Sequence, residues 1–286
     1  MQASYFNIVG LIGIALFFFF LVVSFSGFLS AIRPSKIHSS ITPASFDLDF
    51  EKVEMETTDG IKLRGWLVPK QNSDKIIITL HGYPATKVDI LPTITFLHED
   101  FNLLLFDFRY FGESNGSYTT IGAKEVNDLL AAVEFAKEKG FQKIGVWGFS
   151  MGGAVALMTV SKTSDINVIV ADSAYATLSL FATDPYRNLV FLKYPLAFFT
   201  RLWPRIFLGM SIEEASPVEK VKGVKIPILL IHSFDDEVVS FQHALLLKDA
   251  LKDNPLAEFW FEGGVLHGQV QKEYQKRVSE FFQKNL

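Results

Sequence analysis

The chain has 286 residues, of which 49% are hydrophobic and 20% are charged, so it carries enough apolar material for a large folded core. Its net charge of -4 comes without a basic stripe that could follow a phosphate backbone, which argues against a nucleic-acid-binding protein. The chain contains no cysteine, and this excludes disulfides, thiolate metal sites, iron-sulfur clusters and a cysteine nucleophile.

The first apolar segment runs from residue 8 to residue 32 without a charge and includes four consecutive phenylalanines. Its length matches the roughly 20 residues that cross a bilayer, and it exceeds the apolar stretch of a signal peptide, about 7 to 15 residues. We therefore expect an N-terminal tail at 1–7 and an uncleaved transmembrane helix at 8–32. A buried core helix and a cleaved signal peptide are the alternatives.

The charges beside this segment predict an orientation. No Lys or Arg precedes it, and the nearest basic residues, Arg33 and Lys36, both follow it. By the positive-inside rule, the remainder of the chain is expected on the cytoplasmic side of the membrane. Residues 33–45 are rich in Ser, Thr and Pro and are predicted to form a tether.

Residues 46–286 are predicted to form one domain, because short apolar runs alternate with longer helical patterns, as in a mostly parallel sheet flanked by helices. The dipeptide Asp59-Gly60 between apolar runs predicts an opening hairpin. Helices are predicted at 121–137 and 154–161. The expected strands are 53–57, 63–68, 76–80, 102–106, 143–147, 168–171, 227–231 and 257–261.

One interval, 176–225, is far longer than an ordinary connection between a strand and its neighbour and is interpreted as an insertion. It is rich in aromatic side chains, and basic residues are interleaved among them. These basic residues are Arg187, Lys193, Arg201 and Arg205.

The pentapeptide Gly148-Phe149-Ser150-Met151-Gly152 lies between a predicted strand and a predicted helix. A sharp strand-to-helix turn of this kind exposes the serine hydroxyl, and small residues on either side relieve the crowding. The pattern indicates a nucleophile elbow with Ser150 as the nucleophile.

A serine hydroxyl is a weak nucleophile at neutral pH and needs a histidine base oriented by a carboxylate. The expected chain order after such an elbow is acid, then histidine. Asp235 and Asp236 follow the strand at 227–231, and His267 follows the strand at 257–261 on a glycine-containing loop. His267 is therefore predicted to be the base, and one of the two aspartates the acid.

The other histidines stand in settings that favour ordinary structural roles. His38 falls in the tether, His232 closes a predicted strand, and His98 and His243 fall in helical patterns where exposure or local hydrogen bonding is expected.

An acyl-transfer site also needs two backbone N–H donors for the developing oxyanion. Met151, directly after the nucleophile, is expected to supply one of them. Tyr83, on the glycine-containing loop that follows the strand at 76–80, is expected to supply the other.

With these motifs, the chain resembles an α/β-hydrolase fold protein of the serine aminopeptidase-like and monoacylglycerol lipase-like branch, over roughly residues 53–286. In that family the acid stands three residues before a valine, which selects Asp236 over Asp235, although Ser240 replaces the proline that usually follows. The resemblance also implies that 176–225 is a helical cap, that the stretch containing Asp107, Arg109 and Ser114 is structural, and that Tyr110 replaces the usual glycine.

The combined expectation is a membrane-anchored serine hydrolase that cleaves an ester or thioester of a small molecule or lipid through an acyl-serine intermediate. No metal or organic cofactor is expected. A serine peptidase of the same branch and a non-catalytic membrane-anchored binding protein remain alternatives. A haloalkane dehalogenase or epoxide hydrolase is disfavoured, since those relatives carry aspartate in place of Ser150.

Overall fold

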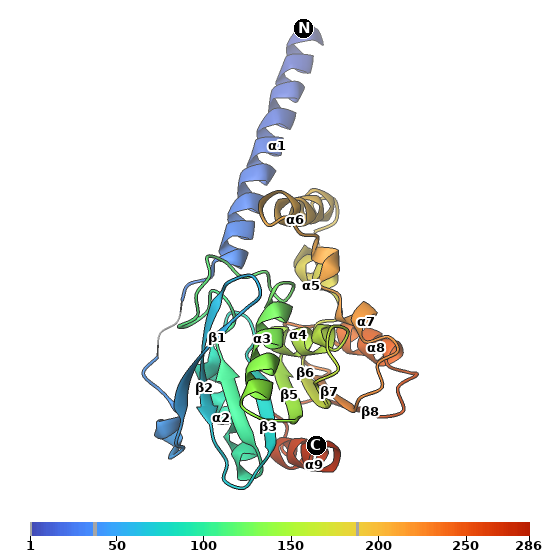
Figure 1. The fold of residues 1–286 in the computed structure, drawn as a ribbon. Coiled ribbons are helices and arrows are strands. Elements are labelled where there is room, and N and C mark those ends of the chain that lie inside the picture. Colours follow the sequence, from blue (N-terminus) through green and yellow to red (C-terminus); the bar gives the residue numbers. More distant parts are fainter. Residues whose placement is uncertain (1, 37–38, 187–188) are drawn as a thin grey trace.

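The computed structural model describes residues 2–36, 39–186 and 189–286, so His38 and Arg187 lie outside the described residues. Its centre is an eight-stranded sheet in the order β1-β2-β4-β3-β5-β6-β7-β8 (Figure 1). The pairs β1–β2 and β2–β4 are antiparallel, and the remaining pairs are parallel. The chain therefore has the mostly parallel sheet of the α/β-hydrolase fold.

The strands lie within two residues of their predicted positions, because the central ones are short apolar runs buried on both faces, as parallel strands are. They are β1 (Glu51–Glu56), β2 (Lys62–Val68), β3 (Lys75–Leu80), β4 (Asn102–Phe106), β5 (Lys143–Phe149), β6 (Val168–Asp172), β7 (Ile228–Ser233) and β8 (Ala257–Glu262).

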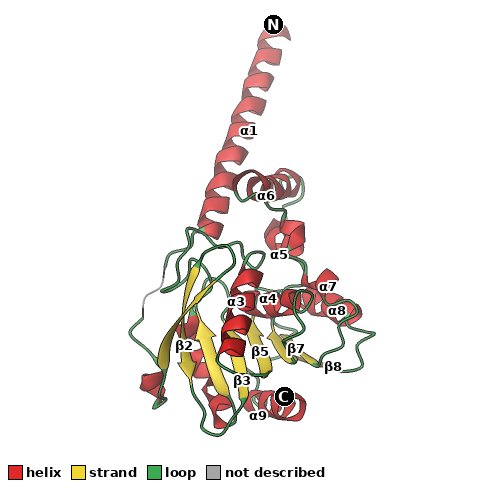
Figure 2. Cartoon of the chain, viewed as in Figure 1, coloured by secondary structure: helices red, strands yellow, loops and turns green. Residues whose placement is uncertain are grey.

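Helices cover both faces of the sheet, and the sheet separates the hydrophobic core into two layers (Figure 2). One face packs against α3 (Glu125–Glu138), α4 (Met151–Thr159) and α8 (Phe241–Ala250). The other packs against α2 (Lys87–Ile94), the 3-10 helix η2 (Thr95–Glu99) and α9 (Tyr274–Asn285).

Helix α3 begins at Glu125, so the predicted start at residue 121 is wrong. Ile121 and Gly122 have φ angles of 53° and 117°, which the α-helix does not allow. The Glu125 carboxylate accepts hydrogen bonds from the backbone amides of Thr120 and Gly122. Ile121 packs against the core although it is not helical. Its apolar side chain therefore looked in the sequence like the first residue of the helix.

Helix α1 (Gln2–Ile32) projects away from the sheet (Figure 1). Its segment Gly10–Ile32 is long and apolar enough to cross a membrane. The helix begins earlier than predicted, since residues 2–7, expected as a tail, continue it. Its last turn packs on the domain, where the Tyr83 hydroxyl donates to the Ala31 carbonyl at 3.0 Å and the Thr119 amide donates to the Ile32 carbonyl at 2.9 Å.

The predicted tether at 33–45 is attached to the domain at both ends. Arg33 Nε donates to the Ser117 carbonyl at 3.1 Å, and the Tyr110 hydroxyl donates to the Pro34 carbonyl at 2.7 Å. At the other end lies a short 3-10 helix, η1 (Pro43–Phe46), in which Pro43 is buried. The Tyr110 side chain that departs from the family pattern thus holds the segment that follows α1.

The insertion at 176–225 is mainly helical. It contains α5 (Leu178–Thr183), η3 (Asp184–Tyr186), α6 (Lys193–Phe207), η4 (Ile212–Glu214) and α7 (Pro217–Lys220). Helix α6 lies beside α1, above the carboxyl end of the sheet (Figure 1). The insertion therefore stands over the edge where parallel strands present their functional loops.

Candidate active site

Ser150 lies in the turn between β5 and α4, with φ 52° and ψ -113°. A non-glycine residue adopts this region at a cost of roughly 1–3 kcal/mol. A Cβ on Gly148 would lie 2.5 Å from the backbone of Gly152, and a Cβ on Gly152 would collide with the Leu80 carbonyl oxygen. The turn therefore requires glycine at both positions, and the Ser150 amide is fixed by donating to the Asp172 carbonyl at 2.8 Å.

The structure brings together the three residues that the sequence assigned to the reaction. His267 Nε2 lies 3.2 Å from Ser150 Oγ, and His267 Nδ1 lies 2.7 Å from Asp236 Oδ2. The three come from loops after β5, β7 and β8. These loops meet at one edge because the strands are parallel and close together in the sheet, with only β6 between β5 and β7. The geometry is that of a nucleophile, a base and an orienting acid.

Asp236, and not Asp235, is the carboxylate beside His267. Burial raises the pKa of Asp236, but hydrogen bonds from His267 and from the Val239 and Val238 amides outweigh it, and the pKa lies below its ordinary value. Asp235 is exposed and accepts instead from the Gly264 amide at 2.7 Å. Asp236 is therefore held as an anion where it can stabilise a charged imidazole.

Glu237, which no sequence pattern indicated, holds the histidine loop. Its Oε2 accepts a hydrogen bond from the His267 backbone amide at 3.0 Å. The acid loop therefore contacts both the side chain and the backbone of His267. No spacing rule marks such a residue, because a carboxylate beside the acid is common on exposed loops.

The remaining described histidines have structural roles. His232 is buried at the end of β7, and its Nε2 lies 2.8 Å from the Val239 carbonyl. His81 is buried between the Gly82 carbonyl and the Phe108 amide. His98 Nε2 lies 2.9 Å from the Pro69 carbonyl.

The prediction that His243 is exposed or locally bonded is wrong. His243 is fully buried, and its Nδ1 accepts from the Ala176 amide at 2.9 Å, 67 positions earlier in the chain. Burial lowers the pKa of His243 to about 4, so the side chain is neutral near pH 7. It fastens the start of the cap to α8.

The loop expected to carry the oxyanion donors runs alongside the nucleophile. A Cβ on Gly82 would lie 3.3 Å from the Ser150 Cβ, so this loop approaches closely because it has glycine there. Among the described residues, no hydrogen bond is found from the backbone amides of Tyr83 or Met151. Both amides are thus available to a ligand oxygen.

A buried polar chain that sequence reasoning missed lies beneath Ser150. The Trp147 indole donates to the Tyr274 hydroxyl at 2.9 Å, and this hydroxyl donates to Asp172 Oδ2 at 2.8 Å. Ser173 donates to Asp172 Oδ1 at 3.0 Å. Burial raises the pKa of Asp172 to about 6, although these hydrogen bonds oppose the shift.

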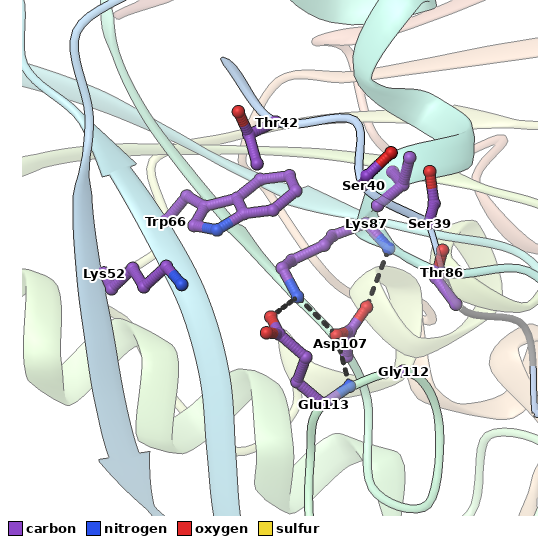
Figure 3. Close-up of a pocket in the computed structure, with 11 residues that line it drawn as sticks. Ser39, Ser40, Thr42, Lys52, Trp66, Thr86, Lys87, Asp107, Gly112 and Glu113 are labelled. Carbon is purple, nitrogen blue, oxygen red and sulfur yellow. Dashed lines mark hydrogen bonds and ion pairs between the residues drawn. The ribbon is translucent and has the colours of Figure 1, made fainter. Parts of the chain in front are cut away.

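The predicted structural stretch is tied down by ion pairs. A cavity of about 280 Å³ there contains Lys87, whose ammonium lies 2.5 Å from Asp107, 2.7 Å from Glu113 and over the ring of Trp66 (Figure 3). The Lys87 ammonium is therefore already paired with two carboxylates.

The rest of the same stretch is equally fixed. Arg109 pairs with Asp128 and Asp59, and the Ser114 hydroxyl donates to the Asp107 carbonyl at 2.6 Å. Asp107, Arg109 and Ser114 therefore shape the loop beside the site and do not reach the reacting groups.

A larger cavity of about 1020 Å³ lies between α1, the cap and the site. At the end of the cavity near the reacting groups, its wall includes Tyr83, Asp236 and Glu237. Elsewhere the wall is mainly apolar and comes from α1 and the cap. Within the described residues, no cluster of three or more His, Asp or Glu is placed to hold a metal ion.

The chain is similar to a known protein family and to a solved esterase structure. The model of the prolyl oligopeptidase family matches residues 111–286. An esterase from Pyrococcus furiosus is 31% identical with a TM-score of 0.74, over 89% of this chain and 98% of its own.

Two further relatives match over shorter parts of the chain. The protein YqkD of Bacillus subtilis is 28% identical over 235 residues, which is 78% of this chain and 75% of YqkD. The thiohydrolase aneE of Aspergillus aculeatus is 31% identical over 129 residues, 43% of this chain and 41% of aneE.

Proposed function

Because the chain belongs to the prolyl oligopeptidase family and is a serine hydrolase, we propose that its reaction is the cleavage of carboxylic esters or thioesters of acyl or lipid-like substrates. The observation that carries this proposal is the continuous line of hydrogen bonds from Ser150 through His267 to Asp236, beside a mainly apolar cavity whose wall includes Asp236. The likeness to an esterase and to a thiohydrolase supports the choice of bond.

The proposed reaction has two halves. Ser150 Oγ attacks the carbonyl carbon while His267 Nε2 takes its proton, and Asp236 stabilises the resulting imidazolium. The amides of Tyr83 and Met151 bind the tetrahedral oxyanion. His267 then protonates the leaving alcohol or thiol, and a water activated by His267 releases the acid from Ser150.

Helix α1 is proposed to be a membrane anchor. The alternative, a signal sequence that is removed, is disfavoured because α1 contributes to the fold through the Tyr83–Ala31 hydrogen bond and the contact of Ser24 with Trp203. Arg33 and Lys36 follow the span, and on the positive-inside rule we propose that the hydrolase domain lies on the cytoplasmic side.

A peptidase is the second candidate, since the family model that matches is named for an oligopeptidase. The cavity distinguishes the two on physical grounds. A peptide's amide groups lose hydrogen bonds to water when bound against apolar walls, and each unpaired group costs about 1–3 kcal/mol. An acyl chain has no such groups and gains from the same burial.

The test compares substrates on the purified full chain in detergent. We expect hydrolysis of p-nitrophenyl esters and acyl thioesters, loss of both in Ser150→Ala, and little hydrolysis of aminoacyl and dipeptidyl p-nitroanilides. A higher kcat/KM on the anilides would establish the peptidase. Folded protein without activity on any of these substrates would favour a binding protein.

A further inference from the structure

The wall of the large cavity includes one face of the N-terminal helix. The α1 residues that line it recur at helical spacing, so they form a single stripe along the helix: Val23, Ser24, Gly27, Phe28, Ala31 and Ile32. Facing them, α6 contributes Leu196, Thr200 and Pro204, spaced four residues apart. The same helix that resembles a membrane span is therefore part of the pocket.

Helices α1 and α6 are packed together by aromatic side chains. Phe17 contacts Phe199, and Phe25 contacts Trp203, with ring centroids 6.2 Å and 5.1 Å apart. The Trp203 indole donates to Ser24 Oγ at 3.1 Å. These contacts run over two to three turns of α1, so the cap helix lies against the apolar helix itself and not below its end.

This packing brings the cap to the membrane wherever the bilayer is placed along α1. The helix has no charged residue from Gln2 to Ile32, and a hydrocarbon core takes up about 20 of its residues. A core that takes up residues 2–21 of this helix includes the contact of Phe17 with Phe199. A core placed nearer the domain includes more of α6.

The exposed face of the cap suits that location. Phe191, Tyr194 and Phe198 are 82%, 66% and 59% exposed, and Val190 is 64% exposed. Phe198 packs on Phe199, which contacts Phe17, so aromatic contacts join this exposed side chain to α1. Exposed apolar side chains of this kind are unfavourable in water, whereas a bilayer surface would cover them.

We propose that α1 is a wall of the acyl-binding pocket and that the substrate is a long-chain ester drawn directly from the bilayer. The inference rests on the proposed function and names its substrate class. The acyl chain occupies the cavity between α1 and α6, and its carbonyl reaches Ser150 near Tyr83 and Asp236. A volume of about 1020 Å³ is at the upper end of ligand pockets, as a long chain requires.

A single glycine gives a sharp test. Gly27 lines the cavity, and a Cβ added there meets no atom within 4 Å, so Gly27→Leu fills the pocket without disturbing the helix. Gly13, on the same helix but away from the cavity, also has open space around an added Cβ, and Gly13→Leu is the matched control.

The measurement is kcat/KM for p-nitrophenyl acetate, butyrate, laurate and palmitate, with the full chain in phosphatidylcholine vesicles. Each methylene kept out of an apolar pocket weakens binding roughly four-fold. We expect wild type to prefer the long chains and Gly27→Leu to lose at least about ten-fold on palmitate. All four esters in Gly13→Leu should stay within about two-fold of wild type, and the ratio of kcat/KM for palmitate to that for acetate should fall only in Gly27→Leu.

Two outcomes would overturn this inference while leaving the proposed function intact: a wild-type preference for acetate, or equal chain-length profiles in wild type and Gly27→Leu. If wild type hydrolyses none of these esters, the proposed function itself fails. The two failures are thereby distinguishable.

A second measurement does not depend on activity. Trp203 lies at the contact of α6 with α1, whereas the other tryptophans, Trp66, Trp147 and Trp260, lie in the sheet. Brominated lipids should quench part of the fluorescence of the wild type in vesicles, and Trp203→Phe should remove that part. Equal fractional quenching in both proteins would place the cap away from the membrane.

Discussion

The edge of the sheet and the cap region are built in opposite ways. At the edge, Asp236 is buried and accepts three hydrogen bonds, and Ser150 is held in a strained turn between glycines. In the cap, α6 meets α1 through aromatic rings, with the Trp203–Ser24 bond as the one side-chain hydrogen bond between them in the described chain. The groups around Ser150 are thus positioned by directed polar contacts, whereas the cap is held against α1 mainly by apolar surfaces.

The strongest loss of activity is predicted for removal of the Asp236 charge. Asp236→Asn should lower kcat for ester hydrolysis about 10^4-fold, because the imidazolium loses its anion and His267 its correct tautomer. Asp235→Asn is the matched control and should change kcat less than about ten-fold, since Asp235 contacts the Gly264 amide. The reverse order of effects would assign the acid to Asp235.

The next largest effect concerns the ion pairs beside the site. Arg109→Leu should lower the free energy of unfolding by about 3–5 kcal/mol, because it leaves Asp128 buried without its partner. Asp59→Asn removes only the partly exposed partner of Arg109 and should cost less than about 1 kcal/mol. Denaturant titration of the full chain in detergent measures both, and equal losses would contradict this account.

The buried Asp172 predicts that the free energy of unfolding falls as pH rises, whereas a carboxylate with a lowered pKa makes it rise. Burial raises the pKa of Asp172 from an ordinary value of 3.8 to about 6, so folding favours the protonated form. The stability contributed by this group is present below pH 4 and is lost as pH rises to 6, by about 3 kcal/mol. In Asp172→Asn that loss should vanish from the free energy of unfolding between pH 4 and 7. An unchanged pH dependence would show that Asp172 titrates normally.

A smaller loss of stability is expected where α6 packs against α1. Ser24→Ala removes the hydrogen bond from Trp203 but keeps the aromatic contacts, so the cap should loosen by only about 0.5–1.5 kcal/mol. Tryptic cleavage at Arg201 and Arg205, both exposed in α6, should rise by no more than about ten-fold. Detachment of the whole cap would mean that this one bond, and not the aromatic packing, holds it.

The sequence was sufficient for the features whose cause is local. The turn around Ser150 depends on two glycines two positions away, and the central strands are short apolar runs, so both can be read from neighbouring residues. His267 could be assigned because the base follows the acid along the chain in this fold. The two side chains meet because the parallel strands before them end at one edge of the sheet.

Contacts between distant segments could not be predicted from the sequence. Tyr274 reaches Asp172 across 102 positions, and Trp203 reaches Ser24 across 179. The phenylalanines of α1 fit a membrane span, and nothing in their spacing separates a face that meets lipid from a face that meets the cap. The start of α3 was misplaced because Ile121 is apolar for packing and not for helix formation.

Labelling of the full chain in detergent with a fluorophosphonate, which modifies only an activated serine, tests whether Ser150 is the nucleophile. We expect stoichiometric labelling of wild type, none in Ser150→Ala, and strongly slowed labelling in His267→Ala, because the base 3.2 Å from the hydroxyl is gone. A folded wild type that stays unlabelled, or equal labelling of Ser150→Ala, would contradict the assignment of Ser150 as the nucleophile.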